Sequence, residues 1–185
     1  MTAPGLMTPD CMTAVVSNRG ILRPALPTEF DDIYALGRDV WGEGLAEVEY
    51  LQLCRGSVKY KSGQWYLFER ADGRIASAVI TYFLAPVLEK TTLGVGSLAT
   101  HPELRKNGFA SEALAALLAG YSRQFSVEQF FLFAEINLHF YEKLGFVALP
   151  PAMQGYQDSV CMLRAPAYHM PQILQSVKEQ PVRHF

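Results

Sequence analysis

The chain has its most informative segment at residues 98–111, which read Leu98-Ala99-Thr100-His101-Pro102-Glu103-Leu104-Arg105-Lys106-Asn107-Gly108-Phe109-Ala110-Ser111. An apolar strand ends at His101-Pro102, because proline cannot continue a central strand. Apolar residues then recur at helical spacing from Gly108 to Tyr121. The segment therefore predicts a strand, a tight loop and a helix, in that order.

The loop of this segment favours anions. A helix start presents unpaired backbone N–H groups and the positive end of the helix dipole, so it can hold a pyrophosphate largely by main chain. Gly108 and Ala110 let a ligand approach the backbone closely, and Arg105 and Lys106 add positive charge. We therefore expect a phosphate-bearing ligand here.

Strands dominate the chain upstream. Residues 65–70 and 75–84 predict a hairpin with its turn at Asp72-Gly73, and residues 91–100 predict a third strand. Residues 21–25 predict a short first strand. Between them, Phe30, Ile33, Leu36, Val40 and Trp41 share one helical face, and a second helix is expected over residues 46–59.

Two glycines, Gly94 and Gly96, lie inside the third strand. An interior glycine commonly marks a bulge or a close approach of another backbone or a ligand. Residues 94–99 also satisfy the dinucleotide pattern G-x-G-x-x-G/A, but that pattern must open a helix, and His101-Pro102 follows directly. We therefore reject dinucleotide binding. The sequence also contains neither a G-x-x-x-x-G-K-[ST] loop nor an H-E-x-x-H helix.

Downstream, residues 129–134 form a very apolar run that predicts a central strand covered on both faces. A short helix follows, with Asn137 suited to its N-cap, Gly145 to its C′ position and Phe146 to the closing hydrophobic contact. Residues 146–149 and 160–164 predict the last two strands.

Length and composition indicate one domain, since 185 residues of which 50% are apolar can bury one substantial core. We expect a loose leader over residues 1–20, the domain over residues 21–164 and a surface tail over residues 165–185. The net charge of -2 argues against nucleic acid. No apolar run is long enough for a membrane helix, and the three cysteines suggest neither disulfides nor zinc, so we expect a cytoplasmic protein without metal.

Two motifs together resemble the GNAT superfamily of N-acetyltransferases. Arg105-x-x-Gly108-x-Ala110 resembles its acetyl-CoA loop at every specified position, although Lys106 and Asn107 stand where many members have glycine followed by lysine or glutamine. Residues 137–146, with the core Phe-Tyr-x-x-x-Gly-Phe, resemble the family's late helix. The resemblance implies a mixed α/β fold, with a strongly bent, mainly antiparallel sheet split at the coenzyme site and helices on both faces.

The resemblance also implies roles for individual residues. Tyr141 is expected to protonate the leaving thiolate, and an N–H near Leu98 to polarise the thioester carbonyl. The coenzyme-binding residues that it implies are Leu98, Ala99, Thr100, Arg105, Lys106, Asn107, Gly108, Phe109, Ala110, Ser111, Asn137 and Tyr141. The general base stays open, because Gly94 stands where several members carry glutamate. Glu135 is the nearest candidate, and His139, His101 and an ordered water are alternatives. No role is assigned to His169 or His184.

The expected reaction is direct transfer of an acetyl group from acetyl-CoA to a primary amine of a small molecule or peptide in a ternary complex. Two alternatives remain: a non-catalytic acyl-CoA-binding or sensing module, and transfer of a longer acyl group. Groups available to contact the amine are Trp41, Glu43, Tyr50, Tyr156 and Asp158. We expect no membrane partner and a monomer or homodimer.

Overall fold

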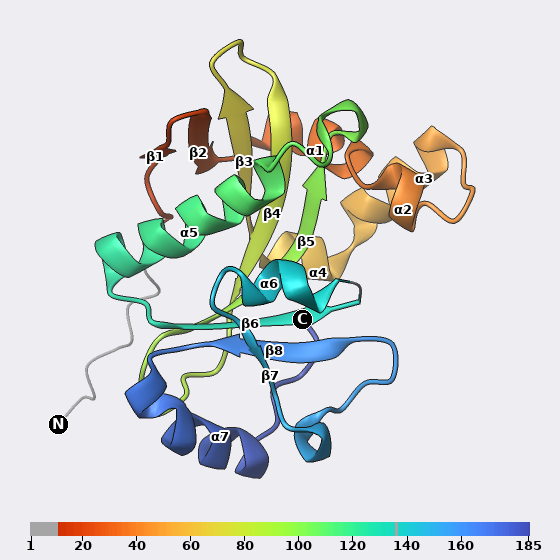
Figure 1. Cartoon of the computed structure of the whole chain (residues 1–185). Coiled ribbons are helices and arrows are strands. Elements are labelled where there is room, and N and C mark those ends of the chain that lie inside the picture. The colour runs from red at the N-terminus through yellow and green to blue at the C-terminus, as the bar shows by residue number, and fades with distance from the viewer. Residues whose placement is uncertain (1–10, 136) are drawn as a thin grey trace, which may run out of the picture.

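The computed structural model describes residues 11–135 and 137–185, through which one eight-stranded sheet runs in the order β1-β2-β3-β4-β5-β6-β8-β7 (Figure 1). The strands are β1 Val15–Val16, β2 Gly20–Pro24, β3 Gln64–Arg70, β4 Ile75–Phe83, β5 Thr92–Thr100, β6 Gln129–Ala134, β7 Val147–Ala148 and β8 Val160–Arg164. Neighbouring strands are antiparallel except β5 and β6, which are parallel. The predicted mixed α/β fold with a mainly antiparallel sheet is confirmed.

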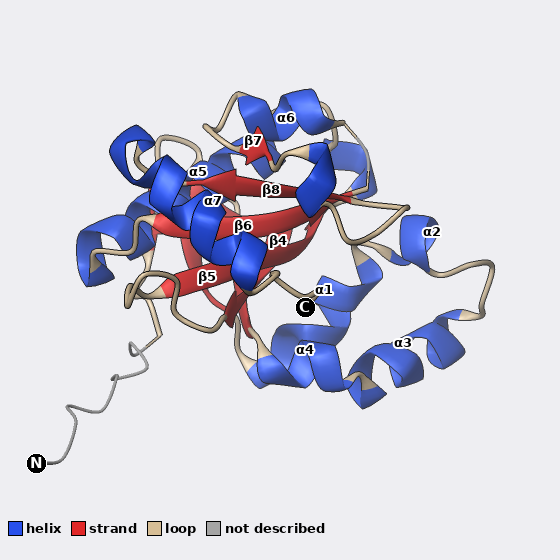
Figure 2. Cartoon of the chain, turned by 90° about the horizontal axis from the view of Figure 1, so that it is seen from below, coloured by secondary structure: helices blue, strands red, loops and turns tan. Residues whose placement is uncertain are grey.

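Helices cover both faces of this sheet. They are α1 Phe30–Ala35, α2 Arg38–Trp41, α3 Glu47–Gly56, α4 Val58–Ser62, α5 Phe109–Phe125, α6 Leu138–Glu142 and α7 Met170–Glu179. Successive strand residues point to opposite faces, so Tyr66 of β3 packs in one core cluster with Leu117 of α5. Its neighbour Leu67 packs in another with Ile33 of α1 and Tyr50 of α3. Figure 2 shows α3 and α4 on the side of the sheet away from α5.

The first predicted helix is interrupted, which corrects the sequence analysis. The α-helix is interrupted at Leu36 and Gly37, between α1 and α2, and a Cβ atom at Gly37 would lie 2.1 Å from the Trp41 ring. Val40 is 58% exposed and so is not on the buried face. The second predicted helix is also divided, because Ser57 ends α3 and caps α4 by accepting a hydrogen bond from the Tyr60 N–H at 3.2 Å.

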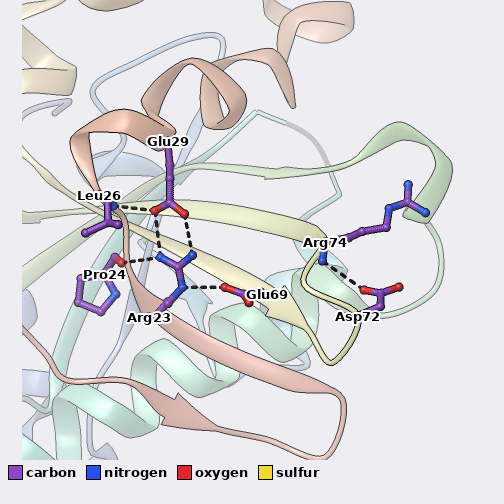
Figure 3. A network of polar contacts seen from close by, with 7 residues as sticks. All are labelled: Arg23, Pro24, Leu26, Glu29, Glu69, Asp72 and Arg74. Atoms are coloured by element: carbon purple, nitrogen blue, oxygen red, sulfur yellow. Dashed lines mark hydrogen bonds and ion pairs between the residues drawn. The ribbon is translucent and has the colours of Figure 1, made fainter.

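Arg23 of β2 holds the entry to these helices (Figure 3). Its guanidinium donates two hydrogen bonds to Glu29, at 2.9 and 2.6 Å, and one to Glu69 of β3, at 2.8 Å. Glu29 also accepts a hydrogen bond from the Leu26 N–H at 2.7 Å. The two carboxylates raise the pKa of Arg23, so the guanidinium stays charged and fixes where α1 starts on the sheet.

The expected loose leader differs from the structure from Cys11 onward; residues 1–10 lie outside the described residues. Met12 is fully buried, and its N–H donates to the Tyr66 hydroxyl at 3.1 Å. The Met12 side chain occupies the space that a Cβ at Gly120 of α5 would need. Strand β1 extends the sheet edge, so these residues belong to the core because they cover α5 and β3.

The expected surface tail also differs, because much of it packs against the sheet. Ile173 and Val177 lie one helical turn apart on α7, and both are buried against Phe131 and Leu163 of β6 and β8. After α7 the chain returns to the sheet, where Phe185 packs on Tyr82. The tail therefore completes the half of the sheet that β6 and β8 form.

The sheet opens between its two parallel strands. The β5–β6 pairing runs only from Thr92–Gln129 to Val95–Leu132, which leaves residues 96–100 without a partner on that side. The register with β4 shifts at the same place, and Ser97 has a φ of 43°. A bulge bends its strand, so β5 turns away from β6 here. Figure 1 shows β6 and β8 crossing the direction of β3 to β5 steeply.

Candidate active site

A cavity of about 500 Å³ lies at this opening. One wall is the main chain and side chains of β5 residues 95–100. The rest is formed by Leu36, Gly37, Val40 and Trp41 from α1 and α2, by Lys59 and Tyr60 from α4, and by Arg105, Phe133, Glu135, Tyr141, His184 and Phe185. Segments far apart in the sequence thus meet where the sheet has unpaired backbone.

The loop before α5 presents a row of donors. The main-chain N–H groups of residues 106–111 have no hydrogen-bond partner in the part of the chain that the structure describes, and the first helical bond runs from the Glu112 N–H to the Gly108 carbonyl at 3.0 Å. Lys106 and Gly108 both have left-handed backbone, with φ of 61° and 83°. Phe109 is buried, so its coenzyme contact would be by main chain. The arrangement fits a pyrophosphate.

Arg105 does not offer its guanidinium to that row, although we expected it to add charge there. Its Nε donates to the Thr100 carbonyl at 3.1 Å, and its terminal nitrogens donate to Asp39 and to the Leu36 carbonyl. Asp39 raises the pKa of Arg105 further, so the group stays charged. Its side chain organises the loop, and a contact of Arg105 with coenzyme stays a prediction for its main chain.

Arg19 lies beside this loop, and the sequence analysis did not predict it there. Its Nη1 donates to the Asn107 carbonyl at 2.7 Å, and its guanidinium carbon lies 4.0 Å from the centre of the Phe109 ring. The residue falls in the segment that we expected to be loose, and no spacing connects it with the loop. Arg19 and the exposed Lys106 carry positive charge beside the loop, and the Arg19 guanidinium also pairs with Glu112 of α5, with 3.6 Å between Nη1 and Oε2.

Tyr141 of α6 also lines the cavity. Its hydroxyl has no hydrogen-bond partner among residues 11–135 and 137–185, while its ring packs edge-on to Phe140 at 4.9 Å. Burial, and secondly the charge of Glu135, raise the pKa of Tyr141. The phenol is therefore protonated at neutral pH and available as a donor.

The turn that ends α6 was predicted correctly. Gly145 has a φ of 85°, the Phe146 N–H donates to the Tyr141 carbonyl at 3.2 Å, and Phe146 is 1% exposed. Asn137 does precede α6, but with a φ of 53° its side chain makes no capping hydrogen bond. That side chain is exposed, so its contact with coenzyme stays a prediction.

Of the four proposed proton acceptors, Glu135 is the one residue in the cavity wall. His139 is exposed and pairs with Glu142, with 3.1 Å between Nδ1 and Oε2. His101 has a buried Nδ1 without a partner among the described residues and lies outside the wall. The geometry therefore favours Glu135 over the two histidines, and an ordered water remains the alternative.

His184 received no role from the sequence, yet it lines the cavity. Its ring stacks on Phe133 with 4.5 Å between centroids, and the main-chain N–H of His184 donates to the Tyr156 hydroxyl at 2.9 Å. Burial, and secondly the charge of Lys59, lower the pKa of His184. No sequence signal could have found it, because only the return of the chain after α7 places it here.

Gly94 makes room for the aromatic ring of Phe185, whereas we expected the close approach of a backbone or a ligand, or a bulge. A Cβ at Gly94 would lie 2.6 Å from the Phe185 ring, which also packs against Tyr82 and Phe133. A Cβ at Gly96 would approach Tyr82 at 3.3 Å. The missing third-strand glutamate is therefore replaced by an aromatic wall.

The acceptor contacts proposed from sequence are divided by the structure. Trp41 lines the cavity, whereas Glu43, Tyr50, Tyr156 and Asp158 do not. Tyr156 lies one layer behind, against His184. Over the described ranges, no helix is long and apolar enough to cross a membrane, and no group of three or more His, Cys, Asp or Glu side chains could hold a metal ion.

Solved structures similar to this chain are acetyltransferases. A putative GnaT-family acetyltransferase from Bordetella pertussis is 19% identical, with 83% of this chain and 99% of that chain covered and a TM-score of 0.60. Mutant forms of a spermidine/spermine N-acetyltransferase from Vibrio cholerae are 14% identical, with 84% of this chain and 99% of that chain covered and a TM-score of 0.60. A ribosomal L7/L12 alpha-N-protein acetyltransferase in complex with coenzyme A is 15% identical, with 82% of this chain and 97% of that chain covered and a TM-score of 0.60. At these identities the likeness shows the fold.

A comparison with curated proteins found no match. The sequence model of the acetyltransferase (GNAT) family, in contrast, matches residues 30–146. That range contains the split strand, the loop with its row of free N–H groups and the helix that carries Tyr141. Because the match spans more than half of the chain, this protein belongs to the GNAT acetyltransferase family.

Proposed function

We propose that this protein transfers an acetyl group from acetyl-CoA directly to a primary amine of a small molecule or peptide, within a ternary complex. One observation carries the proposal: Arg105, at the start of the donor loop, and Tyr141, with its free hydroxyl, line the same cavity, and the unpaired residues 96–100 of β5 line it as well. Phosphates and thioester of one extended coenzyme could thus be bound at once.

The coenzyme would be held mainly by backbone. The free N–H groups of residues 106–111 suit its pyrophosphate. Residues 98–100 offer an unpaired strand edge to the amide-bearing arm, which can pair with it as an added strand would. An N–H near Leu98, in the bulged part of β5, would polarise the thioester carbonyl.

The transfer needs one bond formed and one broken. The amine nitrogen attacks the thioester carbonyl carbon, and the bond from that carbon to sulfur breaks as the amide forms. Tyr141 gives its phenolic proton to the departing sulfur and regains one from solvent. The amine gives up a proton to Glu135 or to water. Phenol and thiol have ordinary pKa values of about 10 and 8.5, and burial raises that of Tyr141 further.

The test is an acetyl-CoA assay over a panel of amines, with free thiol and N-acetyl product measured together. We expect the two products in equal amounts with at least one acceptor. A melting temperature that rises with coenzyme A, without thiol release from any amine, would instead support the binding or sensing module. Butyryl- and octanoyl-CoA in the same assay test the longer acyl group, and a higher kcat/KM with either would replace acetyl in the proposal.

A further inference from the structure

Lys59 is a half-buried cation of the cavity wall that has no ion-pair partner among the described residues. It is half-buried at the start of α4 and lines the wall. Its ammonium has neither a carboxylate within 4.0 Å nor a hydrogen-bond acceptor among the residues described, whereas the other cation in the wall, Arg105, is paired with Asp39. A half-buried charge without a partner is unfavourable, so an anionic ligand at this position would stabilise it.

Lys59 lines the same cavity as two other titratable side chains, Glu135 and His184. Burial lowers the pKa of Lys59, and the charge of Glu135 opposes that effect. The charge of Lys59 in turn lowers the pKa of His184. All three groups therefore lie around one space, which Tyr141 also lines.

The phosphates of the coenzyme do not account for Lys59. They are served by the main chain of residues 106–111, in the loop before α5. Lys59 comes instead from α4, on the face of the sheet opposite α5, and its neighbour Tyr60 packs on Trp65 in the core cluster of that face. An anion beside Lys59 would therefore belong to the acceptor.

The remaining walls near Lys59 are aromatic. Trp41 is 36% exposed, and Tyr60, Phe133 and Phe185 also line the cavity. An acceptor that fills this space must therefore bring apolar surface in addition to its charges.

We propose that the acceptor is an α-amino acid with an apolar or aromatic side chain, whose carboxylate pairs with Lys59 while its amine lies toward Glu135 and Tyr141. The inference rests on the proposed function and adds the substrate class. The wall carries one cation without a partner, Lys59, and one carboxylate, Glu135, which match the two charges of the zwitterion. A polyamine matches less well, because its second ammonium group would meet the Lys59 ammonium.

The experiment compares each amino acid with its decarboxylated counterpart. Phenylalanine is paired with 2-phenylethylamine, tryptophan with tryptamine and leucine with 3-methylbutylamine, and spermidine represents polyamines. The measured quantity is the ratio of kcat/KM within each pair. The intrinsic reactivities of the two amines differ, but they cancel when the ratio of a variant is divided by the ratio of the wild type.

Lys59→Met removes the charge and keeps a similar length. We expect it to lower the amino acid preference by roughly 10- to 100-fold, the worth of a hydrogen bond to a charged group, with Lys59→Arg retaining part of it. Lys61→Met is the matched control, because Lys61 is an exposed lysine of the same helix outside the cavity wall. The control should leave the ratio unchanged.

Equal ratios in the wild type and Lys59→Met, with thiol release intact, overturn the inference and leave the proposed acetyl transfer standing. A higher kcat/KM with spermidine than with any amino acid also overturns the inference and leaves the proposed acetyl transfer standing. Absence of thiol release with every amine, although coenzyme A raises the melting temperature, counts against the proposed function itself. A melting curve for each variant shows that a changed ratio does not come from partial unfolding.

Discussion

Asp39 and Arg105 form a two-pronged ion pair, with 2.5 Å between Oδ2 and Nη1 and 2.7 Å between Oδ1 and Nη2. The same guanidinium donates to the carbonyls of Thr100 and Leu36. The Arg105 side chain thus connects its own loop before α5 with the end of β5 and with the segment of α1 and α2. The two halves of the cavity are therefore positioned relative to each other through Arg105.

Asp39→Asn should raise the KM for acetyl-CoA severalfold while the melting temperature changes little. The pair is about one third to one half exposed, and exposed ion pairs contribute at most about 1 kcal/mol to stability. Arg105 lowers the pKa of Asp39, so the pair persists from alkaline pH down through the ordinary carboxylate range. Steady-state kinetics at pH 7.5 measure the effect.

Asp31→Asn is the control for this prediction. It breaks another two-pronged pair of similar exposure, between Asp31 of α1 and Arg55 of α3, and neither residue lines the cavity. Equal KM values for the wild type, Asp39→Asn and Asp31→Asn would show that the Asp39 pair does not organise the coenzyme loop.

Tyr141→Phe should lower kcat by roughly 10² to 10⁴-fold, the usual contribution of a general acid. The melting temperature should hardly change, because the hydroxyl that is removed has no partner among the described residues. The measurement is kcat with the best acceptor, under conditions in which chemistry limits turnover.

Tyr121→Phe gives the opposite pattern and serves as the control. Its hydroxyl is buried and interacts with those of Tyr66 and Thr81, at 2.8 and 3.2 Å, and Tyr121 does not line the cavity. Its loss should cost about 1 to 3 kcal/mol of stability and leave kcat intact. A wild-type kcat in Tyr141→Phe would remove the catalytic assignment.

Gly108→Asp should abolish the rise in melting temperature that coenzyme A causes, because it puts a negative charge against the donor row. At 100 times Kd that rise corresponds to about 2.7 kcal/mol. Gly73→Asp is the matched control, because Gly73 has a similar φ, 79° against 83° for Gly108, but lies in the β3–β4 turn. This control should keep the rise in melting temperature that coenzyme A causes. Retention of the full coenzyme effect by Gly108→Asp would exclude the loop as the phosphate site.

Gly94→Ala should raise the KM for the acceptor, because the added methyl displaces the Phe185 ring from the cavity wall. The effect should nearly vanish in a Phe185→Ala background, where that ring is absent. A double-mutant cycle measures the coupling, expected at roughly 0.5 to 3 kcal/mol for groups in contact. Strict additivity would mean that Gly94 does not act through Phe185.

The pH dependence of kcat should show no alkaline decline up to about pH 9. Burial and the charge of Glu135 raise the pKa of Tyr141 above its ordinary value, so the phenol keeps its proton throughout that range. The profile should instead rise with pH as the bound amine loses its proton. A fall in kcat centred near pH 8 would identify a different group as the acid.

Local patterns predicted the parts of this protein whose causes are local. Residues 129–134 form β6 with the predicted bounds, because a short apolar run between turn signals has few other structures. The turn at Gly145 and Phe146 also follows from neighbouring residues. With the resemblance of the loop to a known family, these features were sufficient to predict the fold and to single out Tyr141 as a candidate.

The composition of the cavity was decided by tertiary packing. Lys59 and His184 have no motif around them, and they meet because α4 lies under the opened strand and the tail returns over Phe133. Met12 and Arg19, expected in a loose leader, are held by residues more than fifty positions away. Periodicity describes how a residue relates to its own helix or strand, whereas these contacts depend on how separate elements pack, which burial of the whole core determines.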